Sequence, residues 1–467
     1  MKLIYGVKDK PKFSQVIVFA IQQLLAIMAA TLVVPVIINS NISNMINDGT
    51  LSWTLDKPMS STVALFGAGI GTLVYLLFTK FRSPVFLGSS FAFLGSMTAA
   101  FAGASSMALG YVGLLLGAIC AGLVYVIIAI IVKFAGVAWI NKLMPTVVIG
   151  PTVTIIGLSL AGNAIGDLQT APAGGDSKVA LICGLVTLAV TIICSVYGKK
   201  MMKLIPFIMG ILAGYAVAAI FTVIGNAAGI DALKVINFSS FEALVADGVG
   251  LKTFIALPEF TFLNALGGFK EINGGYIATV AVAYVPVAFV VFAEHLADHK
   301  NISSIIEKDL LEDPGLHRTL LGDGVGSMAG AIFGGCPNTT YGESVGCVAI
   351  TGNASVVTIV TTAFAAIAIS FLSPFVAFVN SIPSCVMGGV CMALYGFIAV
   401  SGLKMVQKVD LEHNSNLFTV SVILIAGIGG LSISFGQVSI TTIACALILG
   451  ILTNILVDKS RKTGKLD

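Results

Sequence analysis

Long apolar runs separated by short polar stretches recur along the whole chain. A membrane-spanning helix needs about 20 mostly apolar residues. Clear runs of this kind cover residues 13–38, 60–80, 107–133, 143–162, 178–197, 204–226, 275–298, 354–379, 383–402 and 437–457. The stretches 84–103, 319–351 and 415–432 are also apolar, but Gly, Ser, Thr, Pro or Asn interrupt them. Hydropathy alone leaves roughly 11 to 14 spans open. With two short spans in 319–351, the pattern predicts an all-α polytopic membrane protein with 14 transmembrane segments.

Composition and charge support this interpretation. The chain is 57% apolar and 10% charged, with a mean hydropathy of +1.01, whereas soluble domains are about 45–50% apolar and about 25% charged. With 14 spans and the N-terminus inside, 20 of the 25 Lys and Arg residues fall on the inner side and 5 on the outer side. This distribution obeys the positive-inside rule and predicts that both termini are cytoplasmic. The eight cysteines form no CxxC pair and are expected to be buried hydrophobes.

The polar stretch at 230–270 divides the chain near its middle and leaves seven spans on each side. An odd number of spans per half gives the halves opposite orientations, which is the inverted-repeat plan of many secondary transporters. The third span of each half is broken, by PVFLGSSFAF at 84–93 and by GGCPNTTYGES at 334–344. Irregular backbone at membrane depth is tolerated inside protein or along a watery cavity, and paired breaks indicate a binding site. The alternative is that the glycines only let helices pack closely.

Residues 291–301, VFAEHLADHKN, place four ionisable side chains at the end of an apolar run. Glu294 and Asp298 are four apart and therefore share a helix face, where two carboxylates can share a proton or hold a cation. The alternative is that the span ends near Phe292 and these residues form a solvated cap. His295 and His299 have the spacing of metal ligands, so an intramembrane metalloenzyme is a remote alternative. The sequence offers no third histidine in an apolar run.

Glu343 is a second isolated acid, within TTYGESVGCVAIT, and the alternative for it is a solvated loop. If Glu294 and Glu343 face one cavity, they offer acceptors to a ligand rich in N–H groups, and the broken segments offer backbone N–H donors. Phe91 supplies a flat surface for stacking. This combination suits a small planar heterocycle with alternating N–H and C=O groups, of which uracil is the simplest.

Several motifs resemble the nucleobase–ascorbate transporter family (nucleobase:cation symporter-2), and within it the bacterial uracil permeases. They are QQLLAIMAATLVVP at 22–35, FLGSSFAF at 86–93, FAEHLADHKNIS at 292–303, DPGLHRTLLGDG at 313–324 and GGCPNTTYGESVGCVAITG at 334–352. The resemblance implies 14 segments in two inverted repeats of seven, with short strands in broken segments 3 and 10. It divides the chain into a core domain (1–135 and 273–380), a gate domain (136–230 and 381–467, including the cytoplasmic tail) and an extracellular loop (231–272).

The resemblance also implies roles for individual residues. By motif position, Glu294 and Glu343 bond the base, Phe91 stacks on it, and small residues line the pocket. The substrate-binding set that we expect is Glu294, Glu343, Phe91, Gly342, Ala30 and Tyr341, and the ion-coupling set is Asp298 and Glu294. Two positions depart from the pattern: related uracil permeases often have His where this chain has Asp298, and Ser344 replaces the Asn of the family signature.

The sequence therefore predicts a nucleobase:cation symporter of the inner membrane, not an enzyme, with uracil as the expected substrate and H⁺ or Na⁺ as the coupling ion. A xanthine or purine carrier of the same fold is the alternative within transport, and a passive channel is another. The resemblance implies a homodimer in the lipid bilayer. We expect no cofactor, no resident metal and no nucleic-acid partner.

Overall fold

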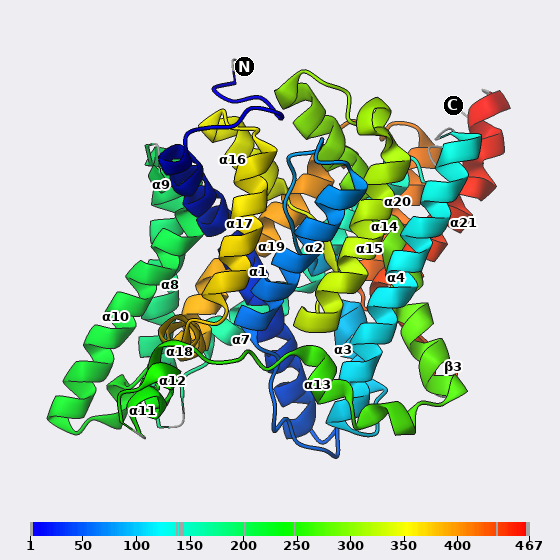
Figure 1. Ribbon diagram of the computed structural model, residues 1–467. Coiled ribbons are helices and arrows are strands. Elements are labelled where there is room, and N and C mark those ends of the chain that lie inside the picture. Colours follow the sequence, from blue (N-terminus) through cyan, green and yellow to red (C-terminus); the bar gives the residue numbers. More distant parts are fainter. Residues whose placement is uncertain are drawn as a thin grey trace.

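The computed structural model describes residues 3–136, 139, 144–172, 174–199, 201–246, 248–435 and 438–463. Helices dominate it, and both chain ends lie on one side of the molecule (Figure 1). The elements of the first half are α1 (Phe13–Asn47), α2 (Ser61–Phe78), β1 (Leu87–Ser89), η1 (Phe91–Phe93), α3 (Leu94–Ala102), α4 (Met107–Ala135), α6 (Thr146–Ser159), α7 (Ala161–Gln169), α8 (Ser177–Tyr197), α9 (Met201–Leu204) and α10 (Pro206–Ala228).

The connection between the halves carries η2 (Asp231–Leu233), α11 (Ser239–Val245), α12 (Leu251–Phe254), α13 (Thr261–Ala265) and η3 (Gly268–Glu271). The second half consists of α14 (Gly274–Ile306), η4 (Leu311–Gly315), α15 (Leu316–Gly334), β2 (Asn338–Thr340), α16 (Gly342–Thr351), α17 (Val356–Ile369), α18 (Ser373–Ser381), α19 (Ser384–Val406), α20 (Asn414–Ile428), β3 (Ile433–Phe435), β4 (Val438–Ile440) and α21 (Thr442–Thr463).

Eight of the helices in the described residues are long and apolar enough to cross a membrane. Shorter apolar helices, among them α17 and α20, accompany them. A helix that is apolar on all sides is suited to a membrane or to the interior of a large protein. The chain is thus a largely helical, multi-pass membrane protein, as the apolar runs predict.

The helix bounds differ from several of the predicted spans. The run 275–298 continues as α14 to Ile306, so the polar residues after Phe292 remain helical. The run 354–379 is divided into α17 and α18, and the run 143–162 is divided into α6 and α7 and extends to Gln169. Hydropathy reports apolar composition and not backbone geometry. It therefore detects neither a helix that continues into polar residues nor a break between two helices within one apolar run. Residues 143 and 437, at the ends of two predicted spans, and Lys2, Lys142, Lys200 and Lys465 lie outside the described residues.

The two broken stretches meet through a short pair of strands, which confirms the expected strands. β1 pairs with β2 in antiparallel register, with Leu87 opposite Thr340, Gly88 opposite Thr339 and Ser89 opposite Asn338. The pairing gives the irregular backbone hydrogen-bond partners that lipid does not supply. Each strand leads into a helix, β1 into η1 and α3 and β2 into α16. Two helix starts, far apart in sequence, are thereby brought together in the interior.

The strand pair rests on α2 and α15, which approach each other closely. A Cβ on Gly67 would lie 2.4 Å from the carbonyl oxygen of Gly330, so a larger residue at position 67 would push these helices apart. Asn338 of β2 then donates from Nδ2 to the carbonyl oxygen of Gly67 at 3.1 Å, and its backbone N–H donates to Ser327 Oγ of α15 at 2.9 Å. The close packing of α2 on α15 therefore fixes the position of the strands.

Candidate functional site

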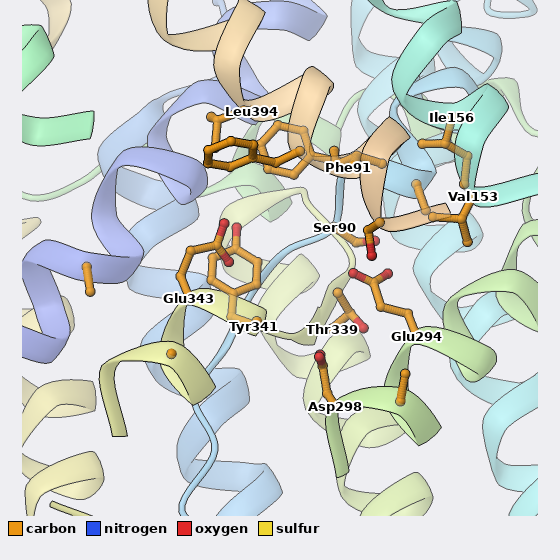
Figure 2. Close-up of a pocket in the computed structure, with 18 of the residues that line it drawn as sticks. Ser90, Phe91, Val153, Ile156, Glu294, Asp298, Thr339, Tyr341, Glu343 and Leu394 are labelled. Carbon is orange, nitrogen blue, oxygen red and sulfur yellow. The ribbon is translucent and has the colours of Figure 1, made fainter. Parts of the chain in front are cut away.

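A cavity of about 450 Å³ lies beside the strand pair, within the range typical of small-molecule sites. One wall is polar and comes from the strand-pair region and α14, with Ser90, Glu294, Asp298, Thr339, Tyr341 and Glu343. The facing wall is apolar and comes from α6, α10 and α19, with Val153, Ile156, Phe207, Leu394 and Phe397. Figure 2 shows residues of both walls pointing into the same space.

The two acids of α14 behave as their spacing predicts. Glu294 and Asp298 lie one helical turn apart and both line the cavity. Asp298 Oδ2 accepts a hydrogen bond from Thr340 Oγ1 at 2.8 Å, which ties α14 to β2. The alternative of a solvated cap after Phe292 was wrong, because α14 continues to Ile306 and the side chain of His299 is fully buried.

Glu343 lies in the first turn of α16, immediately after β2, and lines the same cavity. A carboxylate is stabilised at a helix N-terminus by the positive end of the helix dipole and by free N–H groups. Figure 2 shows Glu343 and Glu294 on different sides of the cavity, with the carboxylate of each directed inward. The structure therefore brings together two acids that are 49 positions apart in the sequence.

Three other predicted residues also line the cavity: Phe91, Tyr341 and Gly342. The ring of Phe91 makes an edge contact with Tyr395 of α19, with 6.3 Å between centroids and an interplanar angle of 76°. The hydroxyl of Tyr341 donates to the carbonyl oxygen of Ser89 at 2.7 Å, so its ring is held against the strands. A Cβ on Gly342 would meet only Asp298, at 3.9 Å, which leaves open space beside the start of α16.

Ala30 is the predicted site residue that does not belong to this set. Its side chain is buried in α1 with a 1% exposed fraction, and it is not among the residues lining the cavity. Ala26, one turn earlier on the same helix, lines the cavity instead. A difference of one turn leaves the helix face unchanged, because residues four apart lie on the same side.

Ser344, the departure from the family signature, points away from the cavity. Its side chain is fully buried, and its Oγ accepts from Gln23 Nε2 at 2.6 Å and from the Phe86 backbone N–H at 3.1 Å. These bonds join α16 to α1 and to the chain before β1. Ser344 thus fixes the start of α16, where Glu343 and Gly342 are located.

The two histidines of α14 face away from the cavity and are fully buried. His295 Nδ1 is 2.6 Å from Asp323 Oδ2, and its Nε2 is 3.0 Å from Thr319 Oγ1, both on α15. His299 Nδ1–H donates to the His295 carbonyl oxygen at 2.8 Å, and its Nε2 is 2.7 Å from the hydroxyl of Tyr75 on α2. Every ring nitrogen of the pair is thus engaged by protein, which disfavours the metalloenzyme alternative.

Two further buried acids escaped the sequence interpretation. Asp323 has a 1% exposed fraction and pairs with His295, and Asp167 of α7 has a 5% exposed fraction and accepts from Ser40 Oγ at 3.0 Å. Both stand in Gly-Asp dipeptides inside apolar stretches. An acid within an apolar run was the signal that could have found them, as it found Glu343.

Comparison with known proteins places the chain in a family. The model of a permease family matches residues 14–435. The uracil permease of Bacillus caldolyticus is 36% identical over 458 residues, covering 97% of this chain and 95% of the relative. The uracil permease of Escherichia coli K12 is 35% identical over 451 residues, covering 96% and 92%.

Solved structures share the fold at low sequence identity. The transmembrane domain of the cyanobacterial bicarbonate transporter BicA has a TM-score of 0.58 at 12% identity, covering 96% of this chain and 99% of that domain. The murine anion transporter Slc26a9 in its inward-facing state has a TM-score of 0.60 at 13% identity, covering 97% and 69%. At this identity the likeness concerns the fold alone. On the match of the family model and the near-full-length relatives, the chain belongs to the nucleobase:cation symporter-2 family of permeases.

Proposed function

We propose that this protein is a secondary active transporter that imports uracil together with H⁺ or Na⁺. The observation that carries the proposal is the joint exposure of Glu294 and Glu343 to one cavity, in a chain whose relatives are uracil permeases. Carboxylates accept hydrogen bonds from the ring N–H groups of uracil. If one of them is protonated, it also donates to a carbonyl oxygen.

The remaining polar wall completes a site for a planar ring. The first turn of α16, which begins at Gly342 beside the cavity, leaves backbone N–H groups without helical partners, and these can donate to an oxygen of the ligand. Phe91 offers a face or an edge to the ring, and the Tyr341 hydroxyl is already engaged with Ser89. The resulting alternation of acceptors and donors matches the alternating N–H and C=O groups of a pyrimidine edge.

The cavity also supports the proposed division into domains. All lining residues of the polar wall fall in the proposed core, 1–135 and 273–380, and those of the apolar wall fall in the proposed gate, 136–230 and 381–467. A cavity between two such units suits alternating access, in which one domain moves against the other around a central site. We propose 14 segments in two inverted repeats of seven, with 231–272 outside and both termini in the cytoplasm. A homodimer in the inner membrane is part of this proposal.

Coupling is assigned to Asp298 together with Glu294. Two carboxylates one turn apart in a cavity repel each other unless a proton or a cation is bound between them. Neutralisation of this pair favours uracil binding, and loss of the ion on the inner side favours release. A purine or xanthine carrier and a passive channel are the competing functions within transport.

The test is direct binding of radiolabelled uracil to the purified protein, with thymine, xanthine and ascorbate as competitors. We expect uracil to bind, and Glu343→Gln to weaken binding by about 100-fold, equivalent to about 2.7 kcal/mol. The reason is that an amide cannot replace a charged acceptor at an N–H group without placing its own donors there. Exposed Glu412 provides the matched control, since Glu412→Gln leaves the cavity unchanged.

Unaltered uracil affinity in Glu343→Gln would refute the assignment of this acid. Tighter binding of xanthine than of uracil would move the protein to the purine branch. In reconstituted vesicles, uptake that never exceeds the equilibrium concentration under a pH or sodium gradient would identify a passive channel.

A further inference from the structure

Five polar side chains form a seam between α7 and the helices α1 and α3. Ser40 Oγ of α1 donates to Asp167 Oδ1 of α7 at 3.0 Å. Asn163 Nδ2 of α7 donates to Asn41 Oδ1 of α1 at 2.9 Å, and Asn41 Nδ2 donates to Thr98 Oγ1 of α3 at 3.1 Å. We call these residues the outer seam. α7 belongs to the proposed gate, and α1 and α3 belong to the proposed core, so the seam joins the two domains.

The outer seam and the opening of the cavity lie toward opposite sides of the molecule. Ser40 and Asn41 stand near the end of α1 that points away from the chain termini, at the level of α7 (Figure 1). The cavity lining instead continues to Lys203 and Leu204 on α9 and to Met405 at the end of α19, on the side of the termini. The cavity therefore extends toward the proposed cytoplasmic side, and the seam closes the proposed external side.

The seam is incompletely satisfied in this arrangement. Asp167 has a 5% exposed fraction, and its Oδ2 finds no hydrogen-bond partner among the described residues. Burying such an atom costs free energy, most of all when the carboxyl group is charged. An acid with an unpaired oxygen at a domain boundary is explained if water hydrates Asp167 in another conformation of the protein.

We propose that the outer seam is the external gate of the transporter, formed when the cavity is open to the cytoplasm and broken when it opens outward. The proposal rests on the proposed transport function. Hydrogen bonds between membrane helices are individually weak, so a few of them bias the equilibrium between the two states without locking it. Asp167 and Asn163 belong to the proposed gate domain, and Ser40 and Asn41 belong to the proposed core domain.

The test measures access to the cavity from each side of the membrane. Gly346 lines the cavity, and a Cβ there would have nothing within 4 Å, so Gly346→Cys introduces a reporter thiol. Labelling by a membrane-impermeant maleimide is timed in right-side-out and inside-out vesicles. The parent protein is labelled in parallel, because the native Cys347 also lines the cavity and its labelling must be subtracted. We expect the double substitution Asp167→Ala and Asn163→Ala to raise the external labelling rate at least tenfold, because the outward-open state becomes more populated.

A matched control is available on the same end of α1. Asn39 exchanges two hydrogen bonds with the backbone of Met59, at 2.9 and 2.8 Å, within the core domain alone. Asn39→Ala should therefore leave external labelling unchanged. If the double variant does not fold, as judged by gel filtration, the single substitutions Ser40→Ala and Asn41→Ala carry the test, each with an expected rise of about threefold.

The outcomes separate this proposal from the proposed function. An external rate that stays at the parental value in the folded seam variants would overturn the gate. An equal rise in Asn39→Ala would also overturn it, because the effect would then be a general loosening of α1. If uracil slowed the labelling of the reporter thiol in none of the variants, that result would instead refute uracil binding in this cavity.

Discussion

The two faces of α14 carry the same kinds of residues in different surroundings. On one face Glu294 and Asp298 border a cavity, and on the other His295 and His299 are enclosed by α15 and α2. The histidine face is saturated, since each ring nitrogen has a partner within 3.0 Å. The acidic face is tied to the protein by the bond from Thr340 to Asp298 and otherwise borders open space.

This difference separates two uses of polar groups in a membrane. Ionisable residues there are costly and are usually assigned to function. On α14, however, the histidines hydrogen-bond to α15 and α2 and thereby set the rotation of the helix. With that rotation the two acids face the cavity and remain available to a ligand. Burial alone does not distinguish the two roles, whereas the presence or absence of a protein partner does.

The largest expected effect is on stability, from the saturated face. Asp323→Ala leaves Nδ1 of His295 unpaired in the buried interior, and leaving a buried hydrogen-bonding group without its partner costs about 1–3 kcal/mol. We expect a large loss of unfolding free energy, measured by denaturant titration in detergent micelles. A variant as stable as wild type would show that the hydrogen bonds of the histidine face do not hold α14 in place.

The second expected effect is on coupling, from the cavity face. Asp298→Asn keeps the side-chain shape and the possible bond to Thr340 but removes one negative charge, so the pair can no longer exchange an ion in the same way. Uracil accumulation in vesicles should lose most of its dependence on the pH or sodium gradient, by about tenfold, while stability changes little. Full gradient dependence would exclude Asp298 from coupling, and a destabilisation as large as that of Asp323→Ala would erase the contrast between the faces.

The smallest expected effect comes from the edge of the saturated face. Tyr75→Phe removes the hydroxyl that bonds both His299 Nε2, at 2.7 Å, and Ser83 Oγ, at 2.6 Å, with little change in the size of the side chain. Such bonds in membrane proteins contribute about 0.6 kcal/mol on average and about 1.7 at most. We expect a slight decrease in stability and an unchanged uracil dissociation constant. A marked change in uracil affinity would connect the two faces and would require the histidines to take part in transport.

The polar wall of the site could be predicted from the sequence because its signals are local. Isolated acids in apolar runs marked Glu294 and Glu343, and helical spacing placed Asp298 beside Glu294. The glycine- and proline-rich breaks predicted irregular backbone at 84–93 and 334–344. Acceptors from the acids and donors from the breaks together indicated a planar polar ligand.

The chain by itself determined where helices form and which residues are too polar for lipid, because both follow from composition and short-range periodicity. Tertiary structure alone decided which polar groups find partners, since those partners are distant in sequence. Tyr75 and His299 are 224 positions apart, and Gln23 and Ser344 are 321 apart. Periodicity assigns a residue to a helix face, but packing against other helices sets the rotation and depth of that face. That is why Ala26 borders the cavity where Ala30 was expected.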